Sequence, residues 1–197
     1  MNFNLERNSL HWHQYIALEE DLIRITRFIE VHDDNMATYS IELARLLLAT
    51  CSQVEIVGKS IASVVGKEAK NIRDIMLVLT ESDPRLVQAK VTIPRYNQES
   101  EPWRAWENQK APAWWDAYNS TKHDEDNALK QASLRNCIDA IAALLLLTLV
   151  LGHHRRVDAF KPSTSLYYPP NDFASLDMMP DGGITYIKYG RPDESGS

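Results

Sequence analysis

The sequence predicts an all-α protein, a helical bundle with a proline- and tryptophan-rich excursion and a small C-terminal arm. Apolar residues recur at steps of three or four along much of the chain, which is the period of a helix with one buried face. Only seven glycines occur in 197 residues, so we expect few turns and long helices. Hydrophobic residues make up 44% and charged residues 24%, the mix of an ordinary globular protein with one core.

Three regions of different composition divide the chain. We expect a helical bundle domain over residues 11–156, a C-terminal arm over residues 157–190 and a disordered tail over residues 191–197. Residues 166–170 and 184–189 have strand character, and an Asp-Gly-Gly turn lies between them. The arm is therefore either a small β-hairpin or an extended segment packed on the bundle.

The first helix is predicted over residues 11–31, where Tyr15, Leu18 and Leu22 begin an apolar face. Glu19 is among the charged residues that this pattern assigns to the surface. His32-Asp33-Asp34-Asn35 follows, a run of poor helix formers that favour turns.

Two further helices have clear end signals. The second is expected from Ser40, whose side chain can cap it, to about residue 65, with Gly66 as its C-terminal stop. The third is expected over residues 68–79, and Asp83-Pro84 ends it.

Residues 84–111 change character. Residues 89–96 can form a short extended segment, which Pro94 excludes from the middle of a sheet. Residues 102–106 indicate a loop or a single helical turn. Such a long connection in a compact helical domain is unusual enough to have a function or to cover something.

A short helix over residues 113–122 and a polar stretch lead into the final helix, which is predicted from Leu129 and interrupted at Gly152. Residues 144–151 are apolar on every side, so neighbouring elements should surround them. The two cysteines, Cys51 and Cys137, lie in apolar helical patterns and are interpreted as buried free thiols of a reduced compartment.

The longest apolar run, residues 138–151, is shorter than the ~18–20 residues that a membrane span needs. We therefore expect a cytoplasmic protein with no membrane association. The net charge of −6 argues against broad electrostatic capture of nucleic acid or anionic lipid.

Metal and cofactor motifs are absent from the sequence: there is no Walker loop, Cys-x-x-Cys, His-Glu-x-x-His or Gly-x-Ser-x-Gly. His32-Asp33 and His123-Asp124 resemble only a two-residue signature of the metal-dependent HD phosphohydrolases, which also need a separate His and a distant Asp. We expect no metal site and no cofactor.

Asn119, Lys122 and His123 lie within one helical turn and should project toward a common sector. Lys122 would lower the proton affinity of the His123 imidazole, whereas Asp124 would raise it. An imidazole beside a cation can act in acid–base cleavage of a phosphodiester. The alternative is that Asn119 and Asp124 cap helices, while Lys122 and His123 lie on a solvated loop.

Long helices followed by a polar Asn-x-x-x-His element resemble the HEPN superfamily. The chain is also similar to uncharacterised bacterial proteins with a Trp-Trp-x-Ala-Tyr-Asn-x-x-Lys-His-Asp element, here starting at Trp114. The resemblance covers about residues 11–156 and implies a compact helical domain, often dimeric, from bacterial toxin, abortive-infection or defence systems. Active members of that superfamily are metal-independent RNases, and their motif is an Arg followed, after four to six residues, by a His.

Tyr118 occupies the position of the motif Arg, so the charge that would serve the phosphate is missing. Two hypotheses follow. The first is a non-catalytic or weakly catalytic interaction module in bacterial defence or a toxin–antitoxin system, with a homodimer through residues 118–123 and a protein partner or an RNA. The second is a metal-independent RNase in which His123 is acid or base, Lys122 stabilises phosphate charge and Asn119 assists.

Four of the five tryptophans, Trp103, Trp106, Trp114 and Trp115, fall within thirteen residues. They either attach the proline-rich connection to the bundle or, together with Tyr118 and Asp124, form a surface for a partner or a stacked base.

Overall fold

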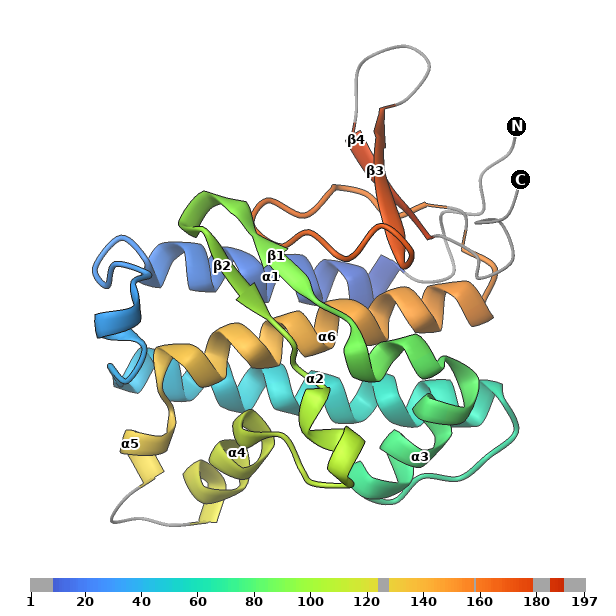
Figure 1. Ribbon diagram of the computed structural model, residues 1–197, viewed down its shortest axis with the longest axis horizontal. Coiled ribbons are helices and arrows are strands. Elements are labelled where there is room, and N and C mark those ends of the chain that lie inside the picture. The colour runs from blue at the N-terminus through green and yellow to red at the C-terminus, as the bar shows by residue number, and fades with distance from the viewer. Residues whose placement is uncertain (1–8, 124–127, 158, 179–184, 190–197) are drawn as a thin grey trace.

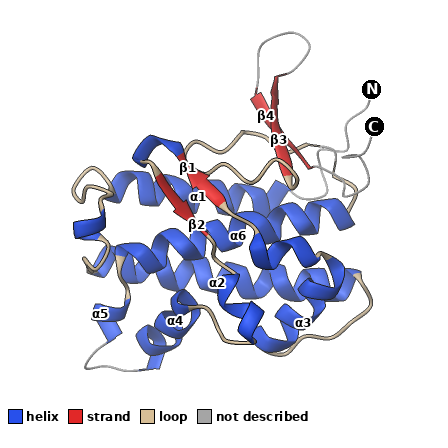
Figure 2. Ribbon diagram, viewed as in Figure 1, coloured by secondary structure: helices blue, strands red, loops and turns tan. Residues whose placement is uncertain are grey.

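The computed structural model describes residues 9–123, 128–157, 159–178 and 185–189. The described chain is mostly helical, which confirms the predicted helical bundle at the level of fold class. It is not purely helical, because two short antiparallel hairpins add strands to the bundle (Figure 2).

Three long helices, α1 (Ser9–Ile25), α2 (Ile41–Val64) and α6 (Leu134–His154), run alongside one another and contact in every pairing (Figure 1). The residues of α6 from Ala140 to Gly152 are buried on every side of the helix, as its apolar sequence predicts. The two free cysteines are both buried, one on α2 and one on α6, and burial raises the pKa of each thiol.

The signals at the ends of α2 are confirmed. The Ser40 hydroxyl accepts a hydrogen bond of 3.1 Å from the Leu43 backbone N–H, and Gly66 beyond the helix has a positive φ of 74°. The third helix, α3 (Ile72–Ser82), starts four residues later than predicted, because the Asn71 side chain caps it.

The first helix ends at Ile25, six residues before the predicted end. The Thr26 hydroxyl donates a hydrogen bond of 2.8 Å to the Ile23 carbonyl, and the chain then turns toward the short helix η1 (Asp33–Asn35). A second expectation for this helix is also wrong, because Glu19 is fully buried instead of exposed.

The predicted final helix is two helices, α5 (Ala128–Gln131) and α6. Between them the Ser133 hydroxyl accepts a hydrogen bond of 3.3 Å from the Asn136 N–H and so starts α6 anew. Gly152 does not interrupt the helix: it is buried within α6, and the Phe160 ring packs directly against it.

Between α3 and α4 the excursion forms two strands and three single helical turns. The strands β1 (Val91–Ile93) and β2 (Gln98–Ser100) pair antiparallel. The 3-10 turn η3 (Pro94–Tyr96) joins them, so Pro94 lies just outside the strand, as expected. The other turns are η2 (Pro84–Gln88) and η4 (Arg104–Asn108).

The C-terminal arm contains the predicted hairpin with one strand displaced. Strand β4 (Thr185–Tyr189) lies where expected, but its partner is β3 (Ala174–Met178) instead of residues 166–170. The displaced segment packs into the bundle core, where Tyr167 is fully buried. The expected turn at residues 181–183 and tail at residues 191–197 lie outside the described residues.

In the described part of the chain, α6 is long and apolar enough to span a membrane, by length and composition alone. However, 83% of its most apolar stretch is buried inside the bundle, as in a core helix of a soluble protein, so it is weak evidence for a span.

Candidate functional site

Helix α4 (Ala113–His123) holds the predicted polar element on its outer face. Pro112 precedes the helix, where its missing N–H costs no hydrogen bond. The apolar face is buried, whereas Asn119, Lys122 and His123 are exposed at the carboxyl end of the helix. The structure therefore brings the three candidate catalytic side chains together at one solvent-accessible helix end.

The predicted tryptophan surface is not exposed. All four tryptophans are buried: Trp103, Trp106, Trp114 and Trp115. The Trp114 ring packs edge to face against both Trp103 and Trp115. Trp114 also donates an indole hydrogen bond of 2.8 Å to the Pro102 carbonyl. These side chains attach the excursion to the bundle, which corrects the alternative of a stacking platform or partner surface.

Tyr118, at the position of the motif arginine, is also buried and packs against Trp115 with ring centres 5.0 Å apart. The ammonium of Lys122 lies 5.6 Å from the centre of the Tyr118 ring, a cation–π distance. The phenol therefore positions Lys122 but presents no flat face for a ligand. Asp124 lies outside the described residues.

Other basic side chains of this region are engaged elsewhere. Arg104 forms an ion pair of 3.1 Å with Glu107, and Arg135 donates hydrogen bonds to Gln98 and to the Glu99 carbonyl. Lys122 is thus the cation nearest His123 along the helix. The described residues contain no group of three or more His, Cys, Asp or Glu side chains that could hold a metal ion.

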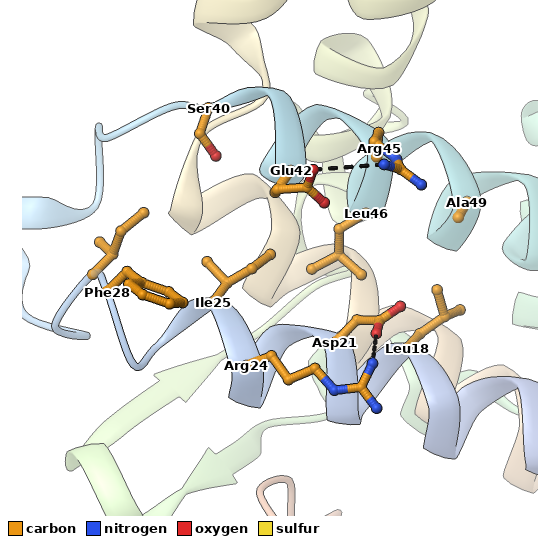
Figure 3. A pocket seen from close by; sticks show the side chains of 11 residues that line it. Leu18, Asp21, Arg24, Ile25, Phe28, Ser40, Glu42, Arg45, Leu46 and Ala49 are labelled. Atoms are coloured by element: carbon orange, nitrogen blue, oxygen red, sulfur yellow. Dashed lines mark hydrogen bonds and ion pairs between the residues drawn. The ribbon is translucent and has the colours of Figure 1, made fainter.

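A groove of about 630 Å³ lies between α1 and α2 (Figure 3). Its wall includes Leu18, Ile25 and Leu46, and the Phe28 ring lies at one end and is 89% exposed. A largely exposed aromatic ring beside an apolar groove is the kind of feature that marks an interaction surface.

The rim of this groove carries both signs of charge. Arg24 pairs with Asp21 at 2.9 Å on α1, and Arg45 pairs with Glu42 at 3.5 Å on α2 (Figure 3). The sequence does not predict this groove. It forms between two helices whose apolar residues have the same spacing as ordinary core residues.

A second feature that the sequence missed is the anchor of the C-terminal segment. The buried Glu19 carboxylate accepts hydrogen bonds of 2.9 to 3.1 Å from the backbone N–H groups of Ser165, Leu166 and Tyr167. The Tyr15 hydroxyl donates a fourth, and burial, aided by the Glu19 carboxylate, raises the pKa of Tyr15 and keeps this donor protonated. Four hydrogen bonds satisfy a carboxylate that would otherwise be costly to bury.

Comparison with known proteins gives no relative: no protein-family model, no curated protein and no solved structure matches the chain.

Proposed function

We propose that this protein is a HEPN-like, non-catalytic interaction module of a bacterial defence or toxin–antitoxin system, and that it acts as a homodimer. The dimer forms where the groove between α1 and α2 of one copy faces that of the other. The observation that carries the proposal is the Phe28 ring, 89% exposed at the end of an apolar groove. The HEPN-like identity rests on the Asn-x-x-x-His element of α4 and its place before the last long helix.

A two-fold arrangement doubles the effect of each apolar side chain, because every residue contributes once from each copy. Burial of one phenylalanine ring stabilises an interface by roughly 1.5–3 kcal/mol. The groove would form the centre of an interface that must bury roughly 1,200–2,000 Å² in total to be stable.

The balanced rim favours a second copy as the occupant. The chain as a whole carries a charge of −6, so two copies repel one another in general. Around the groove, however, Asp21 and Glu42 are matched by Arg24 and Arg45. Each acidic group can then meet a basic group of the other copy, so this face adds little to the repulsion.

Residues 118–123 are less suited to this role than the sequence suggested. Tyr118 is already buried in its own chain, and the side chains left exposed on that turn are polar. Polar surface of this kind belongs to the rim of an interface more than to its centre.

Sedimentation velocity over a range of protein concentrations tests the proposal. The wild type should sediment as a dimer at micromolar concentration, and Phe28→Glu should shift it to monomer, because a charge replaces the exposed apolar ring. Leu77→Glu is the matched control, since Leu77 is 52% exposed on α3 outside the groove. A monomeric wild type, or equal effects of both substitutions, would contradict the proposal.

A metal-independent RNase remains the second candidate, because Asn119, Lys122 and His123 are exposed together on α4. His123 lines neither the groove between α1 and α2 nor the arginine-lined pocket described below. Incubation with a mixed RNA pool in EDTA distinguishes the two functions. Cleavage that is lost in His123→Ala and kept in His13→Ala, an exposed control, would establish the nuclease; no cleavage by the wild type favours the interaction module.

A further inference from the structure

A pocket of about 450 Å³ lies where the tip of the β1–β2 hairpin meets the end of α1. Three of its seven lining residues are arginines: Arg24 on α1, Arg27 in the turn after it, and Arg95 in η3. Its volume falls in the range of small-molecule sites, roughly 300–1,000 Å³.

Hydrogen bonds between the two walls hold the pocket in shape. The Tyr96 hydroxyl donates to the Thr26 hydroxyl at 2.8 Å, and the Thr26 hydroxyl donates to the Ile23 carbonyl at 2.8 Å. The guanidinium of Arg95 lies 5.6 Å from the centre of the Tyr96 ring, which restricts its position. The Tyr96–Thr26 hydrogen bond therefore joins the hairpin tip to the end of α1, and the Tyr96 ring restricts the side chain of Arg95.

The pocket is locally positive in an acidic protein. Its three arginines and one acidic residue, Glu30, give a formal charge of +2, whereas the whole chain carries −6. Arg24 is paired with Asp21 at 2.9 Å and with Glu20 at 3.8 Å, so the positive charge of the pocket comes from Arg27 and Arg95. In the described part of the chain, no ion pair within 4 Å joins Arg27 or Arg95 to an acidic side chain.

We infer that this pocket binds the phosphate group of a small phosphorylated molecule between Arg27 and Arg95. A guanidinium presents a planar fork of N–H donors that matches two phosphate oxygens, so two such groups can hold four. The carboxyl end of α1 lies at the same pocket and its dipole opposes an anion, but this effect is weak and confined to the last turn.

A small ligand fits these features better than a polyanion. The surrounding negative charge of the protein repels a long nucleic acid, whereas one phosphate group meets only the local field. The pocket shares Arg24 with the groove between α1 and α2, but Arg27 and Arg95, which would hold the phosphate, line the pocket alone. Substitutions of Arg27 and Arg95 therefore test the phosphate site separately from the proposed dimer.

Calorimetric titration at low ionic strength tests the inference, with pyrophosphate, adenosine 5′-monophosphate and uncharged adenosine as probes. Both charged probes should bind and adenosine should not. Arg27→Gln and Arg95→Gln should each weaken binding by about 10-fold or more, because each removes a charged bidentate contact. Glu30→Gln should tighten binding by about 3-fold, since it removes the opposing charge of the pocket.

Arg73→Gln is the matched control, because Arg73 is an exposed arginine on α3 outside the pocket. All three arginines are exposed, so each variant should keep the thermal melt of the wild type. Tighter binding of adenosine 5′-monophosphate than of pyrophosphate would indicate that the ligand is a phosphorylated nucleoside. Tighter binding of pyrophosphate would indicate a ligand that is recognised by its phosphates alone. Both results agree with the inference. Absence of wild-type binding at about 10 mM probe, or an equal loss in Arg73→Gln, would overturn it.

Discussion

The Glu19 side chain links the first helix to the C-terminal segment. Its carboxylate is buried on α1, yet three of its hydrogen-bond donors belong to residues 165–167, almost 150 positions away in the sequence. One carboxylate thereby supplies several of the hydrogen bonds that attach the C-terminal segment to the bundle.

Replacement of Glu19 by Gln keeps the shape but turns one oxygen into an N–H donor. That donor would face a backbone N–H group, and the charged hydrogen bonds would be lost. We expect the free energy of unfolding to fall by about 2–4 kcal/mol in denaturant titrations. Glu20→Gln, an exposed neighbour, should change it by less than about 0.5 kcal/mol. Similar stabilities of the two variants would show that the anchor contributes little.

Two histidines near the ends of α1 and α6 give the protein a pH-dependent stability. Burial lowers the pKa of His154, although nearby Asp83 opposes the shift, and burial and then Arg155 lower that of His11. A histidine with a lowered pKa in the folded state binds its proton more readily when unfolded. Its contribution to stability is therefore present above the unfolded pKa of about 6.5 and is lost as the pH falls below it.

The wild type should thus lose more stability between about pH 7 and pH 5 than His154→Gln does. Chemical denaturation at several pH values measures the difference. His13→Gln, an exposed control near the start of α1, should follow the wild-type curve. If the stability of His154→Gln falls with pH as steeply as that of the wild type, the burial of His154 has no effect on its proton binding.

At the scale of elements, the close approach of the arm to α6 depends on Gly152. A β-carbon at this position would overlap the Phe160 ring. Gly152→Ala should therefore destabilise the protein by about 1–3 kcal/mol through overpacking, although alanine favours helix by about 1 kcal/mol. Thermal unfolding of Gly152→Ala and of the double variant with Phe160→Leu checks this. The smaller side chain should restore much of the loss; a stabilised single variant would contradict the packing argument.

The elements that the sequence predicts well are those whose ends are encoded locally. Ser40 and Gly66 define α2 through their own side chain and backbone, so sequence alone places that helix. The burial of Glu19 and the position of the turn after α1 involve distant partners, the backbone of residues 165–167 and the Tyr96 hydroxyl. Hydrophobic periodicity does not report such partners.

The candidate site also has some features that the sequence predicts and others that it does not. Asn119, Lys122 and His123 lie within one turn of α4 and are all exposed, and their catalytic role stays a prediction. The sequence does not decide whether the four clustered tryptophans are buried, because a cluster of large aromatic rings is equally consistent with a core and with a binding surface. The Phe28 ring and the groove beside it become visible only once α1 and α2 are packed.

At the scale of the whole molecule, the central claim is that two copies associate through the grooves between α1 and α2. None of the residues that line this groove belongs to α4, which carries the polar element Asn119 to His123. Because the rim charges balance, we expect the dimer to persist when the salt concentration is raised.

The most direct test is isotope-filtered NMR on an equal mixture of labelled and unlabelled protein. This experiment detects only contacts between copies. The account predicts intermolecular signals that join the Phe28 ring of one copy to the methyl groups of Leu18 and Leu46 of the other. Intermolecular signals that arise instead from Asn119 to His123, or no intermolecular signals at all, would contradict it.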